Sequence, residues 1–243
     1  MFKSILSDKV TDGNINLTKD KRGRKTVYKA CIFDLDGTLT DTLESLTFSV
    51  NETLKEVALP AITEEQCRTF VGNGAKVLIE QSLKAAGDTK LLLFEKAFEA
   101  YGRIFDRNCT YHVKPYPGIR EMLLKLKDQN MKLGVLSNKP DRQAVHVVEE
   151  IFGKETFDLV WGQREGVPRK PDPSALFAMA ESLGVSSEEV LYIGDSEVDA
   201  ATGNAADMDT VLVEWGFRSR EELEKADAYR IVAAADEILD IIR

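Results

Sequence analysis

From Val27 onward, short apolar runs rich in β-branched residues alternate with longer segments whose apolar residues recur at helical spacing. Such runs predict buried strands, and the segments between them predict amphipathic helices. The predicted strands are residues 28–33, 132–137, 158–162, 190–194 and 210–215. The predicted helices of this region are residues 118–129, 140–151, 173–184, 197–206, 219–226 and 235–242. Apolar strands that alternate with helices indicate a doubly wound, Rossmann-like α/β fold, in which helices cover both faces of a parallel sheet.

Residues 42–114 break this alternation, because they contain no run typical of a strand. Four helices are predicted there instead, over residues 42–57, 63–70, 74–86 and 90–107. The stretch "KPYPG" (114–118) then marks a stiff boundary where the chain returns to the alternating pattern.

We therefore expect three parts. Residues 1–26 form a flexible N-terminal tail, residues 27–41 and 115–243 form the α/β core, and residues 42–114 form an inserted helical cap. A cap that lies over the edge of a sheet can close on a ligand, and its two crossings to the core are natural hinges.

The composition is that of an ordinary globular protein, with 43% hydrophobic and 30% charged residues. A net charge of −9 argues against a nucleic acid or an anionic membrane as the main partner. The three cysteines are widely spaced and form no CxxC pair, and Cys31 in an apolar run is expected to be a buried small side chain. No signal peptide or membrane span is predicted, so a reduced, cytoplasmic setting fits best.

Polar residues gather where the predicted strands end. In strand order they are Asp34 and Asp36, then Ser137, Asn138 and Lys139, then Arg169 and Lys170, and finally Asp195 and Asp199. In open parallel sheets, ligands bind beyond the carboxyl ends of the strands. The four segments therefore predict one site that holds three aspartates, a hydroxyl and a lysine.

This set of side chains points to a cation and a phosphoryl group. Two carboxylates about 5 Å apart repel by roughly 3 kcal/mol at an effective dielectric constant near 20, and Asp195 adds a third charge. Oxygen ligands suit Mg²⁺, whose sites are often completed by a substrate phosphate. These segments contain no histidine or cysteine, which disfavours zinc. An EF-hand loop beginning at Asp34 does not fit either, because its sixth and twelfth positions are Leu39 and Ser45.

The stretches "DLDGTLTD", "LSNKP", "RKPDP" and "GDSEVD" resemble, in this order, the four motifs of the haloacid dehalogenase-like phosphohydrolases. The resemblance spans about residues 28–226 and includes the helical insertion. Within that family, "CIFDLDGTL", "RTFVGNGAKVL" and "WGFRSREEL" look most like the phosphoglycolate phosphatase branch. The resemblance implies a Mg²⁺-dependent phosphatase acting on a small phosphorylated metabolite, with 2-phosphoglycolate the best single guess.

The resemblance also implies catalytic and metal-binding roles. Asp34 would be the nucleophile that forms an aspartyl-phosphate, and Asp36 would protonate the leaving oxygen and then activate water. Lys170 would neutralise the phosphoryl charge and pair with the nucleophile. Asp34, the backbone carbonyl of Asp36, and Asp195 would hold Mg²⁺, while Asp199 would bind the ion through water or position Lys170.

For the phosphoryl oxygens, the resemblance implies Thr38, Ser137, the Asn138 backbone amide and Lys170 as partners. Lys139 is expected at the surface where the next helix begins, and Arg169 at the rim of the site. Thr38 also favours hydrolysis over transfer, because mutase relatives often carry valine at this position.

In the cap, "VGNGAKV" lacks the third glycine of a dinucleotide loop, because that position is Val77, and no strand precedes it. The stretch is either the start of a helix that tolerates glycine or a loop over the substrate. In the second case Arg68, Asn73 and Lys76 are candidates to contact a substrate carboxylate.

Three alternatives stay open: a sugar-phosphate mutase-type phosphotransferase, a pyrophosphatase, and a non-catalytic binding module descended from an enzyme. The presence of Asp36 favours phosphate-ester chemistry over dehalogenation, because dehalogenating relatives lack the second aspartate. We expect a monomer or a weak homodimer.

Overall fold

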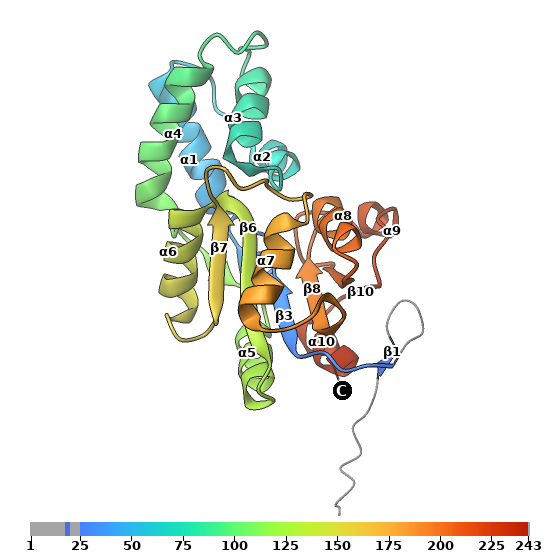
Figure 1. Cartoon of the computed structure of the whole chain (residues 1–243). Coiled ribbons are helices and arrows are strands. Elements are labelled where there is room, and N and C mark those ends of the chain that lie inside the picture. Colours follow the sequence, from blue (N-terminus) through green and yellow to red (C-terminus); the bar gives the residue numbers. More distant parts are fainter. Residues whose placement is uncertain (1–17, 20–24, 243) are drawn as a thin grey trace, which may run out of the picture.

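The computed structural model describes residues 18–19 and 25–242, and its core is a six-stranded sheet with the order β10–β9–β8–β3–β6–β7 (Figure 1). The strands are β3 (Ala30–Phe33), β6 (Lys132–Pro140), β7 (Leu159–Gln163), β8 (Val190–Gly194), β9 (Asp209–Val213) and β10 (Arg230–Val232). Every neighbouring pair is parallel. Central strand β3 places Phe33 opposite Val135 of β6 and Ile193 of β8.

Helices cover both faces of this sheet. On one face lie α5 (Ile119–Asp128), α6 (Asp141–Phe152) and α10 (Ala235–Ile242); on the other lie α7 (Ser174–Leu183), α8 (Glu197–Ala205) and the short α9 (Arg220–Glu224). Because β3 is pleated, Cys31 and Phe33 pack on the face covered by α5, α6 and α10, and Ala30 and Ile32 pack on the face covered by α7. All four side chains are fully buried, which explains why the strand is apolar at every position. The predicted doubly wound α/β fold is confirmed.

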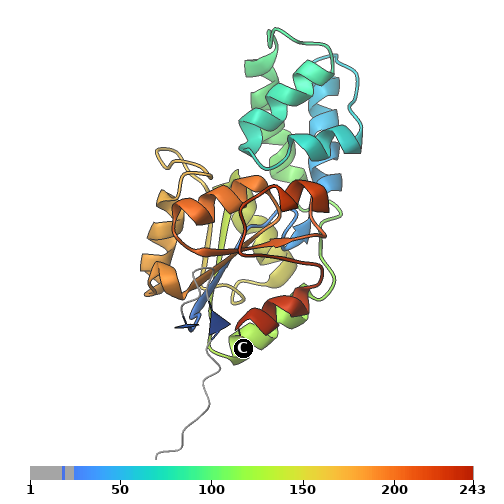
Figure 2. The same ribbon diagram turned by 90° about the vertical axis from the view of Figure 1, so that its right-hand side faces the viewer.

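Four helices form a separate layer above the carboxyl ends of the strands (Figures 1 and 2). They are α1 (Leu43–Glu56), α2 (Glu64–Phe70), α3 (Gly74–Ala85) and α4 (Phe94–Asn108). The two crossings between core and cap, β4 (Thr40–Asp41) and β5 (Lys114–Pro115), pair in antiparallel orientation. The inserted helical cap is therefore present, while the domain bounds at residues 42 and 114 stay a prediction.

Helix α4 begins at Phe94 rather than at the predicted residue 90. The Asp88 carboxylate accepts hydrogen bonds from the backbone N–H groups of Leu92 and Leu93, at 3.0 and 2.8 Å. Leu91 adopts a positive φ of 55°. A side chain that binds nearby backbone donors competes with the helix, and here it holds a turn in place of the first helical turn.

The predicted flexible tail lies largely outside the described residues. Its two described pieces, β1 (Thr18–Lys19) and β2 (Lys25–Thr26), pair in antiparallel orientation.

All three cysteines are buried and form no disulfide, as expected for Cys31. Across residues 18–19 and 25–242, no helix is long and apolar enough to cross a bilayer. A short 3₁₀ helix (Ser187–Glu189) precedes β8.

Candidate active site

The loop after β3 turns sharply, because three successive N–H groups from Thr38 to Thr40 point back to the Leu35 carbonyl. Leu35 is fully buried, whereas the residues on either side of it, Asp34 and Asp36, line one cavity between core and cap. This is the alternation expected of an extended chain. Gly37 then adopts a φ of +86°, a conformation that favours glycine.

Lys170 joins two of the site's carboxylates. Its Nζ lies 2.9 Å from Asp34 Oδ1 and 2.7 Å from Asp199 Oδ1, and its side chain is 3% exposed. Tyr192, from β8, donates a hydrogen bond of 2.8 Å to the same Asp199 oxygen. Burial alone would lower the pKa of Lys170, but the Asp199 and Asp34 carboxylates raise it well above its ordinary value. Lys170 is thus a fixed positive charge beside Asp34.

Asp34, Asp195 and Asp199 form a cluster in which one carboxylate oxygen of each residue lies within 4.8 Å of the others. Burial raises the pKa of Asp34 to about 6 and the pKa of Asp195 well above its ordinary value, and neighbouring carboxylates add to both shifts. Burial also opposes ionisation of Asp199, but Lys170 and the hydrogen bonds that Asp199 accepts lower its pKa. The one lysine does not offset three close carboxylates.

The cluster fits a divalent cation. All of its ligand atoms are oxygens, which hard cations such as Mg²⁺ prefer. The Asp34 Oδ1 atom is buried and, although Lys170 approaches it as an ion pair, accepts no hydrogen bond from the described residues. A cation placed among the three carboxylates would meet this oxygen and relieve their repulsion.

Asp195 is packed against two glycine-containing turns. Its Oδ2 accepts a hydrogen bond of 2.8 Å from the Phe217 N–H, and Thr38 Oγ1 lies 3.4 Å from its Oδ1. A Cβ atom added to either Gly37 or Gly216 would collide with the Asp195 side chain. The structure therefore brings Thr38 to the predicted metal ligand Asp195.

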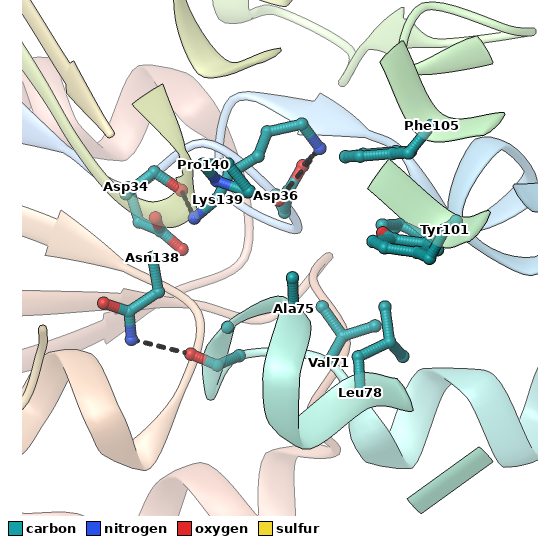
Figure 3. Close-up of a pocket in the computed structure, with 14 residues that line it drawn as sticks. Asp34, Asp36, Val71, Ala75, Leu78, Tyr101, Phe105, Asn138, Lys139 and Pro140 are labelled. Atoms are coloured by element: carbon teal, nitrogen blue, oxygen red, sulfur yellow. Dashed lines mark hydrogen bonds and ion pairs between the residues drawn. The ribbon is translucent and has the colours of Figure 1, made fainter. Parts of the chain in front are cut away.

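Lys139 does not lie at the surface, contrary to the prediction from sequence. Strand β6 continues past residue 137 to Pro140, with a shift in register against β7. Lys139 is therefore part of the strand and not of the following helix. Its side chain is 1% exposed, and its Nζ lies 2.9 Å from Asp36 Oδ1 and 4.6 Å from the centre of the Phe105 ring (Figure 3). Asp36 also accepts a hydrogen bond of 2.7 Å from Thr42 Oγ1. Each aspartate of the "DLD" stretch thus has a lysine of its own.

Asn138 connects three segments of the site. Its side-chain oxygen accepts a hydrogen bond of 2.9 Å from the Lys170 N–H, and its Nδ2 donates to the Lys170 carbonyl at 3.1 Å. The same Nδ2 donates to the Gly72 carbonyl of the cap at 3.0 Å (Figure 3). Beside it, Ser137 Oγ accepts a hydrogen bond of 3.2 Å from the Lys139 N–H. Ser137 and Asn138 both line the cavity.

Three core side chains bind three consecutive carbonyls of the cap, which we name the cap loop (residues 71–73). Arg218 Nη2 donates to the Val71 carbonyl at 3.1 Å, Asn138 to that of Gly72, and Arg169 Nη1 to the Asn73 carbonyl at 2.8 Å. The prediction that Arg169 lies at the rim agrees with this contact. The cap loop is therefore held against the core by three hydrogen bonds.

The structure does not bring the predicted cap contacts to the cavity. Arg68 is 44% exposed, lies 3.8 Å from Glu65 and lines a separate hollow together with Phe217 and Arg218. Asn73 meets the core through its carbonyl, and its side chain is not among those that line the cavity. Lys76 Nζ lies 5.9 Å from the centre of the Phe94 ring.

Two residues of the site, Tyr192 and Arg218, escaped prediction from sequence, and Lys139 was named at the strand end but expected at the surface. Tyr192 left a signal, because a tyrosine in a buried strand needs a partner for its hydroxyl. The signal for Lys139 was its place between Asn138 and Pro140, where the strand continues. Arg218 lies in a loop far along the chain, and its contact with the cap depends on tertiary structure.

Comparisons with known proteins agree with this geometry. Residues 31–213, which contain all four motif segments, match the family described as haloacid dehalogenase-like hydrolase. A phosphoglycolate phosphatase of Haemophilus influenzae is 34% identical over 197 residues, covering 79% of this chain and 88% of the relative. One of Rhodospirillum rubrum is 34% identical over 212 residues, covering 84% and 86%. The crystal structure of a predicted phosphoglycolate phosphatase from Haemophilus somnus has a TM-score of 0.83 at 27% identity, covering 89% of this chain and 98% of that chain.

Proposed function

Since this chain belongs to the haloacid dehalogenase-like hydrolase family, we propose that it hydrolyses a small phosphomonoester with Mg²⁺, and that 2-phosphoglycolate is the first substrate to test. It is a phosphoric monoester hydrolase, similar to the phosphoglycolate phosphatases of Haemophilus influenzae and Rhodospirillum rubrum. The observation that carries the proposal is the buried ion pair of Lys170 with Asp34, beside Asp195 and Asp199 and under a cap.

In the first half-reaction, a carboxylate oxygen of Asp34 attacks phosphorus and forms an aspartyl-phosphate. The bond between phosphorus and the leaving oxygen breaks, and Asp36 gives its proton to that oxygen. Lys139, 2.9 Å from Asp36, stabilises the carboxylate that remains after the proton has left. Lys170 orients the nucleophile and offsets the charge of the transferred group.

In the second half-reaction, Asp36 takes a proton from a water molecule whose oxygen attacks phosphorus. The bond to Asp34 breaks, inorganic phosphate leaves, and both aspartates return to their starting states. Ser137, the Asn138 backbone N–H and Thr38 supply further partners for the phosphoryl oxygens. Mg²⁺ held by Asp34, Asp195 and the Asp36 carbonyl, with Asp199 nearby, would offset the negative charge of the phosphoryl group.

The direct test is release of inorganic phosphate from 2-phosphoglycolate and from a panel of short phosphomonoesters in Mg²⁺. We expect Asp34→Asn to abolish release, because the amide is not a nucleophile. The matched control is Asp128→Asn, at the exposed end of α5, which should keep wild-type activity. Acid-quenched protein should retain phosphate on Asp34 during turnover, and near-normal activity of Asp34→Asn would refute the mechanism.

The same panel separates the alternatives. Inclusion of pyrophosphate detects a pyrophosphatase. Incubation with a hexose phosphate distinguishes a mutase, which yields an isomer, from a phosphatase, which yields free phosphate. A protein that turns over no phosphate compound in Mg²⁺ would point to a binding module.

A further inference from the structure

The cavity between core and cap has two walls of different chemistry (Figure 3). The core wall is polar and includes Asp34, Asp36, Ser137, Asn138 and Lys139. Among the described residues that line the cavity, those of the cap carry no charge. They are Leu46, Val71, Gly72, Gly74, Ala75, Leu78, Tyr101 and Phe105.

The cavity is also small. Its volume is about 40 Å³, whereas a single water molecule needs roughly 10–15 Å³ in this measure. With the cap loop held against the core as it is here, the space suits a compact group of a few heavy atoms. A leaving group as large as a hexose would require the cap to open.

Tyr101 provides the cap wall's one side-chain hydroxyl. It lies on α4, is 2% exposed, and its ring stacks on Phe105 with the ring centres 5.0 Å apart. Figure 3 shows the ring extending from α4 toward the cavity, with the hydroxyl at its far end. Within residues 18–19 and 25–242, this hydroxyl makes no hydrogen bond to another protein group. Burial raises the pKa of the phenol well above its ordinary value, so the group stays protonated and can donate.

We propose that the Tyr101 hydroxyl selects the substrate by donating a hydrogen bond to an acceptor oxygen on the leaving group. The favoured substrates are then short phosphomonoesters that carry a carboxylate or similar acceptor a few atoms from the phosphate. This inference rests on the proposed phosphatase function and adds its specificity-determining contact.

Two features make Tyr101 the candidate for this contact. The phosphoryl group is met by the core wall, so the leaving group must lie toward the cap, where the other lining side chains are apolar. The Tyr101 hydroxyl faces the cavity, so it can donate to a substrate acceptor without first breaking a hydrogen bond to the protein. A site built to form a hydrogen bond also rejects analogues that cannot form it, far more strongly than an apolar pocket rejects a change in size.

The test compares two esters of equal chain length, 2-phosphoglycolate and ethyl phosphate, the second of which lacks the carboxylate. In Tyr101→Phe, which keeps the ring and its stacking on Phe105, we expect kcat/KM for 2-phosphoglycolate to fall by about tenfold or more. The value for ethyl phosphate should change by less than about twofold, since no acceptor is present to lose a partner. The control is Tyr111→Phe, whose ring stacks on Phe48 outside the cavity and whose loss of hydroxyl should affect neither substrate.

The outcomes distinguish failure of the Tyr101 assignment from failure of the proposed phosphatase function. A similar fall for both esters would assign Tyr101 a structural role, and no fall for either would leave it without a role; both results overturn the specificity assignment and leave the phosphatase function intact. A wild-type enzyme that hydrolyses neither ester nor any short phosphomonoester in Mg²⁺ would overturn the proposed function, and the inference with it.

Discussion

The Lys139 ammonium lies 2.9 Å from Asp36 Oδ1 while the Lys139 side chain is 1% exposed. Removing one partner of a buried ion pair leaves the other charge uncompensated, which costs about 3–5 kcal/mol. We therefore expect Lys139→Met to destabilise the protein by about 3 kcal/mol and to lower kcat, because Asp36 loses the cation that stabilises its ionised form. Denaturant unfolding and phosphate release measure the two effects.

The control for this pair is Lys132→Met, at the start of the same strand, where the ion pair with Asp158 is half-exposed. An exposed pair contributes at most about 1 kcal/mol, so this variant should keep activity and most of its stability. If Lys139→Met behaves like Lys132→Met, the buried pair has no part in catalysis or folding.

Mg²⁺ should stabilise the folded protein through the three-carboxylate cluster. A ligand at a hundred times its dissociation constant adds about 2.7 kcal/mol, visible as a rise in the unfolding midpoint. Asp195→Asn should remove this rise, whereas Asp128→Asn should retain it. Without Mg²⁺, we expect Asp195→Asn to be at least as stable as wild type, because burial and neighbouring carboxylates raise the pKa of Asp195. An equal Mg²⁺ response in the two variants would place the ion elsewhere.

The three hydrogen bonds to the cap loop should favour the closed cavity. Arg169→Gln removes one of them, a 2.8 Å contact to the Asn73 carbonyl. Such a bond is worth about 0.5–1.5 kcal/mol, so KM should rise roughly two- to tenfold with a smaller change in kcat. Arg107→Gln, on the exposed side of α4, serves as the control. A fall in kcat at constant KM would instead indicate that Arg169 acts on the chemical step.

The sequence predicted the core of the fold because its central strands, β3 and β8, are apolar along their length. Residues such as Ile32 and Phe33 are buried on opposite faces of the sheet, which is the pattern typical of a parallel sheet covered by helices on both faces. The polar residues at the strand ends followed from the same topology. Strand β10 was missed because it is three residues long and partly exposed.

The cap side of the site could not be predicted in the same way. Arg68 and Asn73 were chosen for their chemistry, but a helix surface offers several directions, and packing sets which residue faces the cavity. Tyr101 and Phe105 are four residues apart on α4 and share its inner face. Their aromatic pattern equally suits cap packing, so it indicates a binding wall only once the opposite strand ends are in place. The roles of the predicted site residues stay predictions until the variants are measured.

Asp158 should make stability depend on pH. Burial opposes its ionisation, but the Leu133 N–H, which donates at 2.8 Å, and the Lys132 ammonium together lower its pKa. A carboxylate whose folded-state pKa is lowered stabilises the protein above its unfolded pKa of about 4, and this stabilisation is lost as pH falls through the folded value. The free-energy difference between wild type and Asp158→Asn should therefore shrink between neutral pH and pH of about 3.

The size of that effect is limited by solvent, because Asp158 is 37% exposed. We expect less than about 1 kcal/mol. Unfolding titrations of both proteins across this pH range measure the difference in free energy of unfolding. A difference that grows as the pH falls would show that ionised Asp158 does not stabilise the folded protein.

Gly37 should be essential for two separable reasons, its backbone conformation and its contact with Asp195. Its φ of +86° strains any residue with a Cβ, by roughly 1–2 kcal/mol. An added Cβ would also collide with the Asp195 carboxylate and approach the Phe217 ring to 3.0 Å.

Gly184 isolates the effect of backbone conformation, because its φ is +75° and an added Cβ there meets nothing within 4 Å. We expect Gly184→Ala to lose stability alone. Gly37→Ala should lose stability, activity and the response to Mg²⁺, since Asp195 must move. Calorimetry with and without Mg²⁺ separates the two, and equal behaviour of the variants would mean that the Gly37–Asp195 contact does not position the proposed metal ligand.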